Sequence, residues 1–214
     1  MTTLGILGAG RVGTALARVA LNAGFRVLLT NSRGPESLGL HVSILTPGAV
    51  ASDLDTIRSE ADLVYLALPL GRYASLPRTG WRGKVVIDGM NYWPAGEGTR
   101  DEFDSDPGSS SLVVQRHLTD ARVVKTLNHI GYHDLEEDGL PEGTPDRRAL
   151  GIAGDDADAR AEVASFLSAL GYDSLDFGGL KQGRRFGTGS AIFEGRFTRS
   201  EMALDEKNFL GGGV

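Results

Sequence analysis

Short apolar segments alternate along the chain with segments whose apolar residues recur at helical spacing. Residues 3–7 (TLGIL) form a compact apolar run, which is typical of a buried strand. In the segment that follows, Val12, Leu16 and Val19 share one face of a predicted helix over residues 12–22. A strand followed by an amphipathic helix is the unit of a right-handed crossover. The pattern therefore predicts an α/β fold with a doubly wound, mostly parallel sheet.

The same alternation continues to residue 177. Further strands are predicted at 26–30, 43–45, 63–68, 84–88, 122–126, 150–153 and 174–177, and further helices at 49–58 and 157–170. Stretches 94–111 and 136–148 are rich in polar residues, glycine or proline and are predicted to be exposed loops, and 211–214 is predicted to be frayed. We divide the chain into a nucleotide-binding domain, 1–180, and a small C-terminal extension, 181–214.

The composition excludes several classes of function. The chain has no cysteine, which excludes disulfides, a thiol nucleophile and cysteine-ligated metal centres and fits a reducing, cytoplasmic location. With 22 Lys and Arg against 28 Asp and Glu, the net charge of −6 disfavours a nucleic-acid partner. The longest apolar stretch, 63–70, is shorter than the ~18 residues of a membrane helix. We expect a protein that binds small molecules, with no nucleic-acid or membrane partner.

The first predicted strand leads into a glycine-rich turn, Gly8-Ala9-Gly10-Arg11-Val12-Gly13. Gly8 allows a tight turn, Gly10 lets backbone approach a pyrophosphate, and Gly13 lets the helix pack close to the strand. The N-terminus of the helix then presents free N–H groups to the anion. An ordinary strand-to-helix turn is the alternative, but the flanking strand and helix favour a dinucleotide-binding domain of the Rossmann type.

The end of the second strand indicates which dinucleotide is bound. An NAD site places Asp or Glu here to accept from the ribose 2′-OH, whereas this strand ends in Asn31-Ser32-Arg33. Ser32 can donate to a 2′-phosphate, and Arg33 can pair with its oxygens. We therefore predict NADP(H) as the cofactor. The alternative is that Arg33 is a solvated surface arginine.

Two later strand ends are also candidates for the cofactor cleft, because ligands of doubly wound sheets bind at the carboxyl ends of the strands. Leu68, Pro69 and Leu70 are expected to flank the nicotinamide ribose, and Asn91 is expected to hold the nicotinamide amide or the ribose. In the same turn, Tyr92 and Trp93 could stack on a flat acceptor, or they could cover the edge of the core.

Few side chains suited to acid–base catalysis follow these strands. Asn128 and His129 could orient a ring carbonyl of an acceptor. A ketone or imine reductase would need a proton donor, for which Tyr92, His129, Tyr132 and His133 are candidates. His129 and His133 are four residues apart, but Gly131 lies between them, so we predict no metal site.

Several segments together resemble the NADPH:coenzyme F-420 oxidoreductase family. They are GILGAGRVG, NSR, LALP, VVKTLNHIG and GIAGDDADARAEVASFLSALGYDSLDFGGL, and they extend from about Thr3 to Arg185. The resemblance implies hydride transfer between NADP(H) and a deazaflavin, coenzyme F-420, in a homodimer. It implies that Asn128, His129 and Ile130 lie beside the two rings and that the C-terminal extension, through Arg184, closes the acceptor site. Another acceptor (a flavin, quinone, imine or ketone) and a non-catalytic NADP(H) sensor remain alternatives.

The first prediction concerns cofactor preference. Because no carboxylate follows the second strand, we expect the protein to bind NADPH more tightly than NADH. Titration of each dinucleotide, followed by its fluorescence, measures both dissociation constants. Equal constants would contradict the assignment.

Overall fold

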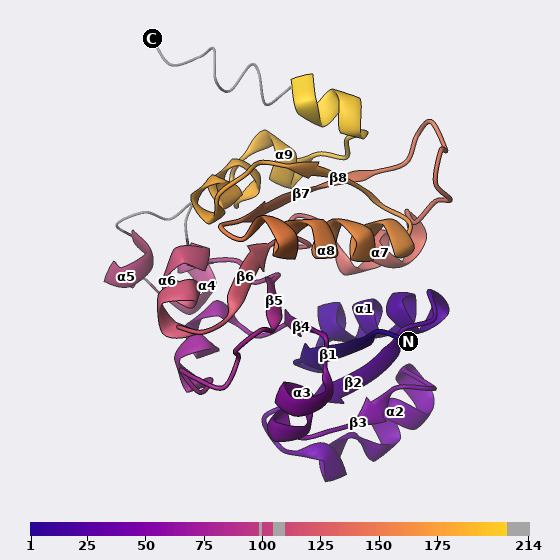
Figure 1. Cartoon of the computed structure of the whole chain (residues 1–214), viewed down its shortest axis with the longest axis vertical. Helices are drawn as coiled ribbons and strands as arrows, with labels where there is room; N and C mark the ends of the chain where they lie inside the picture. Colours follow the sequence, from indigo (N-terminus) through magenta and orange to yellow (C-terminus); the bar gives the residue numbers. More distant parts are fainter. Residues whose placement is uncertain (99, 105–109, 205–214) are drawn as a thin grey trace.

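The computed structural model describes residues 1–98, 100–104 and 110–204, which form an α/β unit around one eight-stranded sheet (Figure 1). The strand order is β3-β2-β1-β4-β5-β6-β7-β8, and Figure 1 shows it running from β3 at the bottom to β8 at the top. The strands are β1 (Thr3–Leu7), β2 (Arg26–Thr30), β3 (Val50–Ala51), β4 (Leu63–Leu66), β5 (Val85–Asp88), β6 (Arg122–Lys125), β7 (Ala149–Gly154) and β8 (Asp173–Asp176).

The first six strands are parallel, as predicted, and β7 reverses direction. β7 pairs antiparallel with β6, and β8 pairs parallel with β7. The doubly wound, mostly parallel sheet of a Rossmann-type fold is therefore confirmed. Because β1, β2, β4, β5 and β6 run in one direction, their carboxyl ends meet at one edge, which is where ligands bind in this architecture.

Helices cover both faces of the sheet and divide the core in two. One cluster packs Leu16, Leu135 and Phe166 against the sheet, and the other includes Ile57 and Val114. The α-helices are α1 (Arg11–Asn22), α2 (Gly39–Leu45), α3 (Leu54–Glu60), α4 (Pro94–Glu97), α5 (Asp101–Asp104), α6 (Ser110–His117), α7 (Tyr132–Glu137), α8 (Ala157–Ala169) and α9 (Ala191–Glu194). The 3-10 segments are η1 (Pro35–Leu38), η2 (Leu70–Ser75) and η4 (Leu180–Phe186). No helix of the described residues is long and apolar enough to span a membrane.

The prediction of a strand at 43–45 was wrong, because these residues end α2. The third strand is instead Val50–Ala51, after a turn at Gly48 with a φ of +102°. The predicted helix at 49–58 therefore begins later, at Leu54, where the Asp53 carboxylate accepts from the N–H of Thr56. Apolar residues of α2 suggested a buried strand, but the structure leaves no residue of that helix buried.

Both predicted loops contain ordered, buried residues. Residues 94–104 include α4 and α5, and Phe103 of α5 is completely buried. In the second stretch, Arg147 and Arg148 are only 3% and 5% exposed, because carbonyl and carboxylate oxygens surround them. The predicted fraying at 211–214 lies outside the described residues.

A buried ion pair joins the carboxyl ends of β5 and β6. Lys125 Nζ lies 3.6 Å from Asp88 Oδ2 and donates to the carbonyl of Met90. Asp88 also accepts from the Met90 N–H at 2.9 Å and from Ser111 Oγ at 2.6 Å. Burial lowers the pKa of Lys125, and the Asp88 carboxylate opposes that shift. Burial, together with the charge of Asp88, raises the pKa of the Tyr65 hydroxyl, which makes no hydrogen bond with the described residues.

The second prediction tests this pair. Lys125→Met leaves Asp88 as a buried charge without its cation, so we expect the free energy of unfolding to fall by about 3–5 kcal/mol. Adding Asp88→Asn removes the uncompensated charge and should recover part of the loss. Urea unfolding measures both variants, with exposed Lys181→Met as the control. A double variant no more stable than Lys125→Met would contradict this account.

Candidate active site

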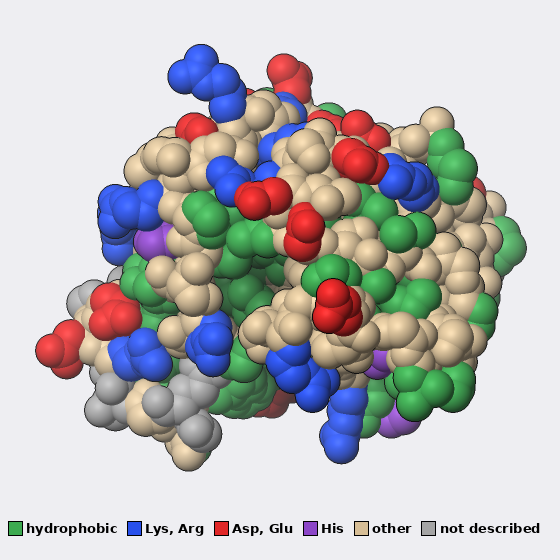
Figure 2. Space-filling model, turned by 90° about the horizontal axis from the view of Figure 1, so that it is seen from below, with side chains coloured by type: hydrophobic (Ala, Val, Ile, Leu, Met, Phe, Trp, Pro, Cys, Tyr) green, Lys and Arg blue, Asp and Glu red, His purple; other side chains and the backbone are tan. Residues whose placement is uncertain are grey.

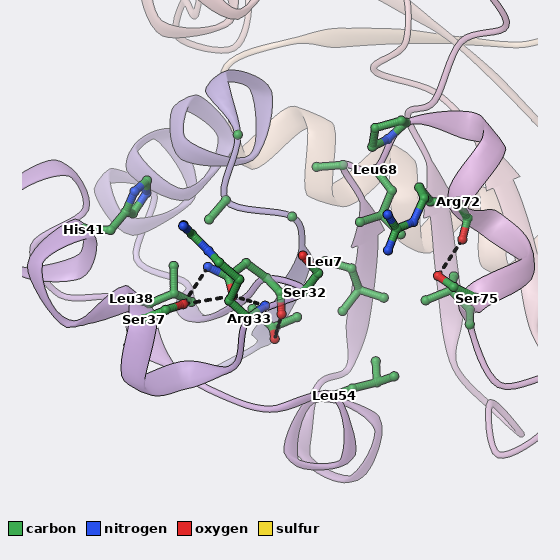
Figure 3. Close-up of a pocket in the computed structure, with 18 residues that line it drawn as sticks. Leu7, Ser32, Arg33, Ser37, Leu38, His41, Leu54, Leu68, Arg72 and Ser75 are labelled. Carbon is green, nitrogen blue, oxygen red and sulfur yellow. Dashed lines mark hydrogen bonds between the residues drawn. The ribbon is translucent and has the colours of Figure 1, made fainter. Parts of the chain in front are cut away.

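The first cavity, of about 520 Å³, lies at the carboxyl ends of β1, β2 and β4 (Figure 3). The glycine turn, the segment after β2 and the segment after β4 form its walls. On the face in Figure 2, a hollow with hydrophobic walls carries Lys or Arg side chains at its edge. The residues lining the cavity include Leu7, Gly8, Ala9, Gly10, Asn31, Ser32, Arg33, Ser37, Leu38, His41, Leu54, Ala67, Leu68, Pro69, Arg72 and Ser75.

The glycine turn has the geometry that a dinucleotide requires. Gly8 has a φ of +122°, and a Cβ there would collide with the carbonyl of Ala67. A Cβ at Gly13 would collide with the carbonyl of Gly8, so α1 packs against the turn only because this residue is glycine. A Cβ at Gly10 would meet nothing within 4 Å, which leaves open space beside the N-terminus of α1. The turn therefore fits a bound pyrophosphate.

The segment after β2 fits an additional phosphate. Asn31 Oδ1 accepts from the N–H of Arg33 at 2.8 Å, and its Nδ2 donates to Ser37 Oγ at 3.0 Å. Asn31 thus holds the turn, while Ser32 and Arg33 are exposed to the cavity. No Asp or Glu is among the described residues that line it. Both features suit NADP(H) rather than NAD.

The remaining predicted cofactor residues lie at different places. Leu68 and Pro69 line the first cavity, whereas Leu70 is completely buried in the core. Val12 and Asn91 line a second cavity. The guanidinium of Arg11 lies 5.8 Å from the centre of the Tyr132 ring, in a groove between α1, α2 and α7.

The second cavity, of about 510 Å³, lies at the carboxyl ends of β5 and β6 and begins at Val12 in the first turn of α1. It brings together Asn91, Trp93, Asn128, His129 and Ile130, all of which the sequence selected. Tyr132, which the sequence offers as a candidate proton donor, also lines this cavity. Residues that the sequence did not select complete the wall, and they include Asp134, Asp138, Arg148, Phe193, Glu194 and Arg196. Phe193, Glu194 and Arg196 follow β8 and are far along the chain from the other wall residues, so nothing in the sequence indicated that they line this cavity.

Asn128 connects three segments of the second cavity. Its Nδ2 donates to Asn91 Oδ1 at 3.1 Å and to the carbonyl of Phe186 at 2.9 Å. The backbone carbonyl of Asn128 accepts a hydrogen bond from Asn91 Nδ2 at 2.7 Å. The residue before it, Leu127, has a left-handed φ of 61°, a conformation that costs a bulky side chain about 1–3 kcal/mol. Because both N–H groups of the amide are used, Asn128 positions the site and has no free N–H for an acceptor.

His129 is a buried neutral imidazole. Its Nε2 accepts from the N–H of Gly151 at 2.9 Å, so the proton lies on Nδ1, 3.1 Å from Asn128 Oδ1. Burial, reinforced by the positive charges of Arg148 and Lys125, lowers the pKa of His129 to about 3. Near neutral pH the ring is therefore not an imidazolium, and it cannot act as a general acid.

Two predicted acceptor-binding residues are not brought to the second cavity. Tyr92 is buried beside Phe103, with ring centres 5.1 Å apart, and its hydroxyl accepts from the N–H of Arg100. Arg184 is exposed on η4 and lines neither cavity. Trp93, by contrast, is half exposed and packs edge-on against Phe193, with ring centres 5.7 Å apart.

A glycine turn that fits pyrophosphate, beside a cavity with no carboxylate among its described lining residues, is typical of an NADP-dependent dinucleotide-binding protein. Residues 3–92 match the family model described as NADP oxidoreductase, coenzyme F420-dependent. A hypothetical protein of Sinorhizobium meliloti, SMa0349, is 30% identical, with a TM-score of 0.78 over 93% of this chain and 96% of that chain. The chain belongs to this oxidoreductase family, and it is an NADP-dependent oxidoreductase.

Other relatives are more distant. A candidate F420-dependent NADP reductase of an Arthrobacter species is 25% identical, with a TM-score of 0.71 over 99% of this chain and 94% of that chain. The rat metalloreductase STEAP3 is 26% identical over 85% of this chain, which spans 35% of that protein's length. An imine reductase of a Pseudomonas species, 16% identical with a TM-score of 0.59, shares the fold over 97% of this chain and 62% of its own.

The third prediction follows from His129. In the unfolded chain a histidine has a pKa of 6.5, and in the folded protein its pKa is about 3. The unfolded chain therefore binds more protons between these values. As the pH is lowered below 6.5, the free energy of unfolding should therefore decrease, by up to about 1.4 kcal/mol per pH unit.

His129→Gln should remove this contribution. Urea unfolding between pH 6.5 and about 5, above most carboxylate titration, measures the difference in slope. His133→Gln, which changes an exposed histidine, is the control and should keep the wild-type slope. The same slope in His129→Gln and wild type would rule out the buried neutral imidazole as its cause.

Proposed function

We propose that the protein transfers a hydride between NADP(H) and a deazaflavin of the coenzyme F-420 class, with the acceptor in the second cavity. The observation that carries this proposal is the position of the two cavities. The first is lined by Gly10 and the second by Val12, so each opens beside the first turn of α1. A dinucleotide that crosses this turn has one end in each cavity.

In the first cavity, the glycine turn binds the pyrophosphate, and Ser32 and Arg33 bind the 2′-phosphate. Leu68 and Pro69 exclude water from the ribose on the nicotinamide side. When bound, NADPH supplies the hydride, and the protein supplies position and electrostatics.

In the second cavity, Trp93 and Ile130 offer flat and apolar surface to an acceptor ring. Asn91 and Asn128 fix the loops that carry these side chains, through the hydrogen bonds between them. Reduction of a deazaflavin by NADPH takes up one hydride and one proton. Because His129 is neutral and both ring nitrogens are bonded, the proton comes from solvent or another donor.

The charges around the second cavity bear on how the acceptor enters. Asp134, Asp138 and Glu194 line it, and Arg148 neutralises part of the first two through ion pairs of 3.2 and 2.8 Å. An acceptor with an anionic tail would direct that tail away from this rim. The exposed Lys181 and Arg184 of η4 offer a cationic surface for it. The homodimer and the cytoplasmic location stay predictions.

A second candidate function is reduction of an imine or ketone, and Tyr132 favours it. Of the four candidate proton donors, Tyr92 is bonded in the core, His129 is neutral, and His133 lines neither main cavity but the groove between α1, α2 and α7. Tyr132 lines the second cavity and makes no hydrogen bond through its hydroxyl with the described residues. It is therefore the donor best placed for such a substrate.

The fourth prediction separates these functions. Oxidation of NADPH, followed by its absorbance, is measured with coenzyme F-420, with FMN and with no acceptor. We expect rapid oxidation with the deazaflavin, slow oxidation with FMN and almost none without an acceptor. Tight NADPH binding without turnover on F-420 would reject the deazaflavin assignment.

Tyr132→Phe supplies the matched test of the second candidate. Loss of a general acid lowers a rate by about 10²–10⁴-fold, so reduction of a ketone or imine should fall by that factor. Hydride transfer to the deazaflavin should stay within a few-fold of wild type. The exposed His133→Gln is the control for both reactions.

A further inference from the structure

Two arginines enter the first cavity from opposite walls (Figure 3). Arg33 follows β2, and Arg72 lies on η2, beside Leu68 on the far wall. Both residues are exposed, and neither guanidinium forms a hydrogen bond or ion pair with any residue that the structure describes. The sequence assigned a role to Arg33 and none to Arg72.

The backbone of η2 holds Arg72 at the cavity. Its N–H donates to the carbonyl of Pro69 at 2.9 Å, and its carbonyl accepts from Ser75 Oγ at 2.7 Å. Leu70 and Leu76, one at each end of the segment, are buried in the core. The Cα of Arg72 is therefore fixed, and the free part of the residue is a side chain that can reach into the cavity.

The position of η2 relative to the glycine turn indicates which part of the dinucleotide Arg72 meets. A Cβ on Gly8 would touch the carbonyl of Ala67, so the end of β4 lies directly against the turn. η2 starts three residues after Ala67, and Pro69, Arg72 and the glycine turn line the same cavity. A pyrophosphate cradled by this turn has one face on the turn and the other toward the wall that carries Arg72.

The charge of the cavity supports the same role. The pyrophosphate of a dinucleotide carries two negative charges, and the described lining residues include no carboxylate to compete for the guanidinium. Arginine binds phosphate oxygens with charge-assisted, often bidentate hydrogen bonds. We propose that Arg72 binds the bridging pyrophosphate from the wall opposite the glycine turn, while Arg33 binds the 2′-phosphate. Arg72 therefore contributes to affinity, and Arg33 contributes to the choice of NADP(H) over NAD(H).

Calorimetric titration of three ligands tests this division, without any need for an acceptor. NADPH carries both phosphate groups, NADH carries only the pyrophosphate, and adenosine 2′-monophosphate carries only the 2′-phosphate. Arg72→Gln should weaken NADPH and NADH alike, by about tenfold, and leave the monophosphate within twofold of wild type. Arg33→Gln should weaken NADPH and the monophosphate and affect NADH much less.

Arg78→Gln is the matched control, because Arg78 is an exposed arginine just beyond η2 that does not line the cavity. It should leave all three dissociation constants unchanged. Unaltered NADPH and NADH binding in Arg72→Gln would overturn the proposal. An equal loss of affinity for all three ligands would also overturn it, because that result would place Arg72 on the adenosine. A loss of affinity confined to NADPH and the monophosphate would overturn it as well, because that result would place Arg72 on the 2′-phosphate.

Discussion

The buried ion pair between Asp88 and Lys125 fixes the edge of the sheet on which the second cavity is built. Both groups are at strand ends, and both also bind the backbone of Met90, so the turn after β5 is held from two directions. Asn91, the next residue, then bonds to Asn128 after β6. Loss of either charge would leave its partner buried and uncompensated, and would release the turn that carries Asn91 and Trp93.

The two cavities differ in the residues that form their walls, and each wall suits the ligand proposed for it. The first has walls from three neighbouring parallel strands and free guanidinium groups, which suits a cofactor recognised by its phosphates. The second has aromatic and acidic side chains from β5, β6 and the segment after β8. Its polar groups near the sheet, Asn128 and His129, are already bonded to protein. Such bonded groups suit the proposed role of the second cavity, which is to position a reactive ring beside the nicotinamide.

Residues close together in the chain were predicted well, and residues brought together from far apart were not. The glycine turn and Asn31-Ser32-Arg33 were identified because each follows its strand directly and its chemistry depends on the local backbone. Tyr92 was ambiguous, since an aromatic at a strand end can face the core or the cleft, and packing against Phe103 decided it. Nothing in the sequence around Arg72 indicated a role, because its place at the cavity depends on how η2 packs against the sheet.

The sequence by itself determined most of the strands, the helices α1 and α8, the dinucleotide turn and the absence of a carboxylate at the end of β2. These depend on side-chain periodicity and on the conformational freedom of particular glycines, which are local properties. Only the tertiary structure decided the direction of β7, because an apolar run of six residues has the same composition in either direction. It also decided that the carbonyl of Phe186, 58 residues beyond Asn128, holds the Asn128 amide, because the hydrogen bond between them forms only when the reversed strand returns the chain to that edge.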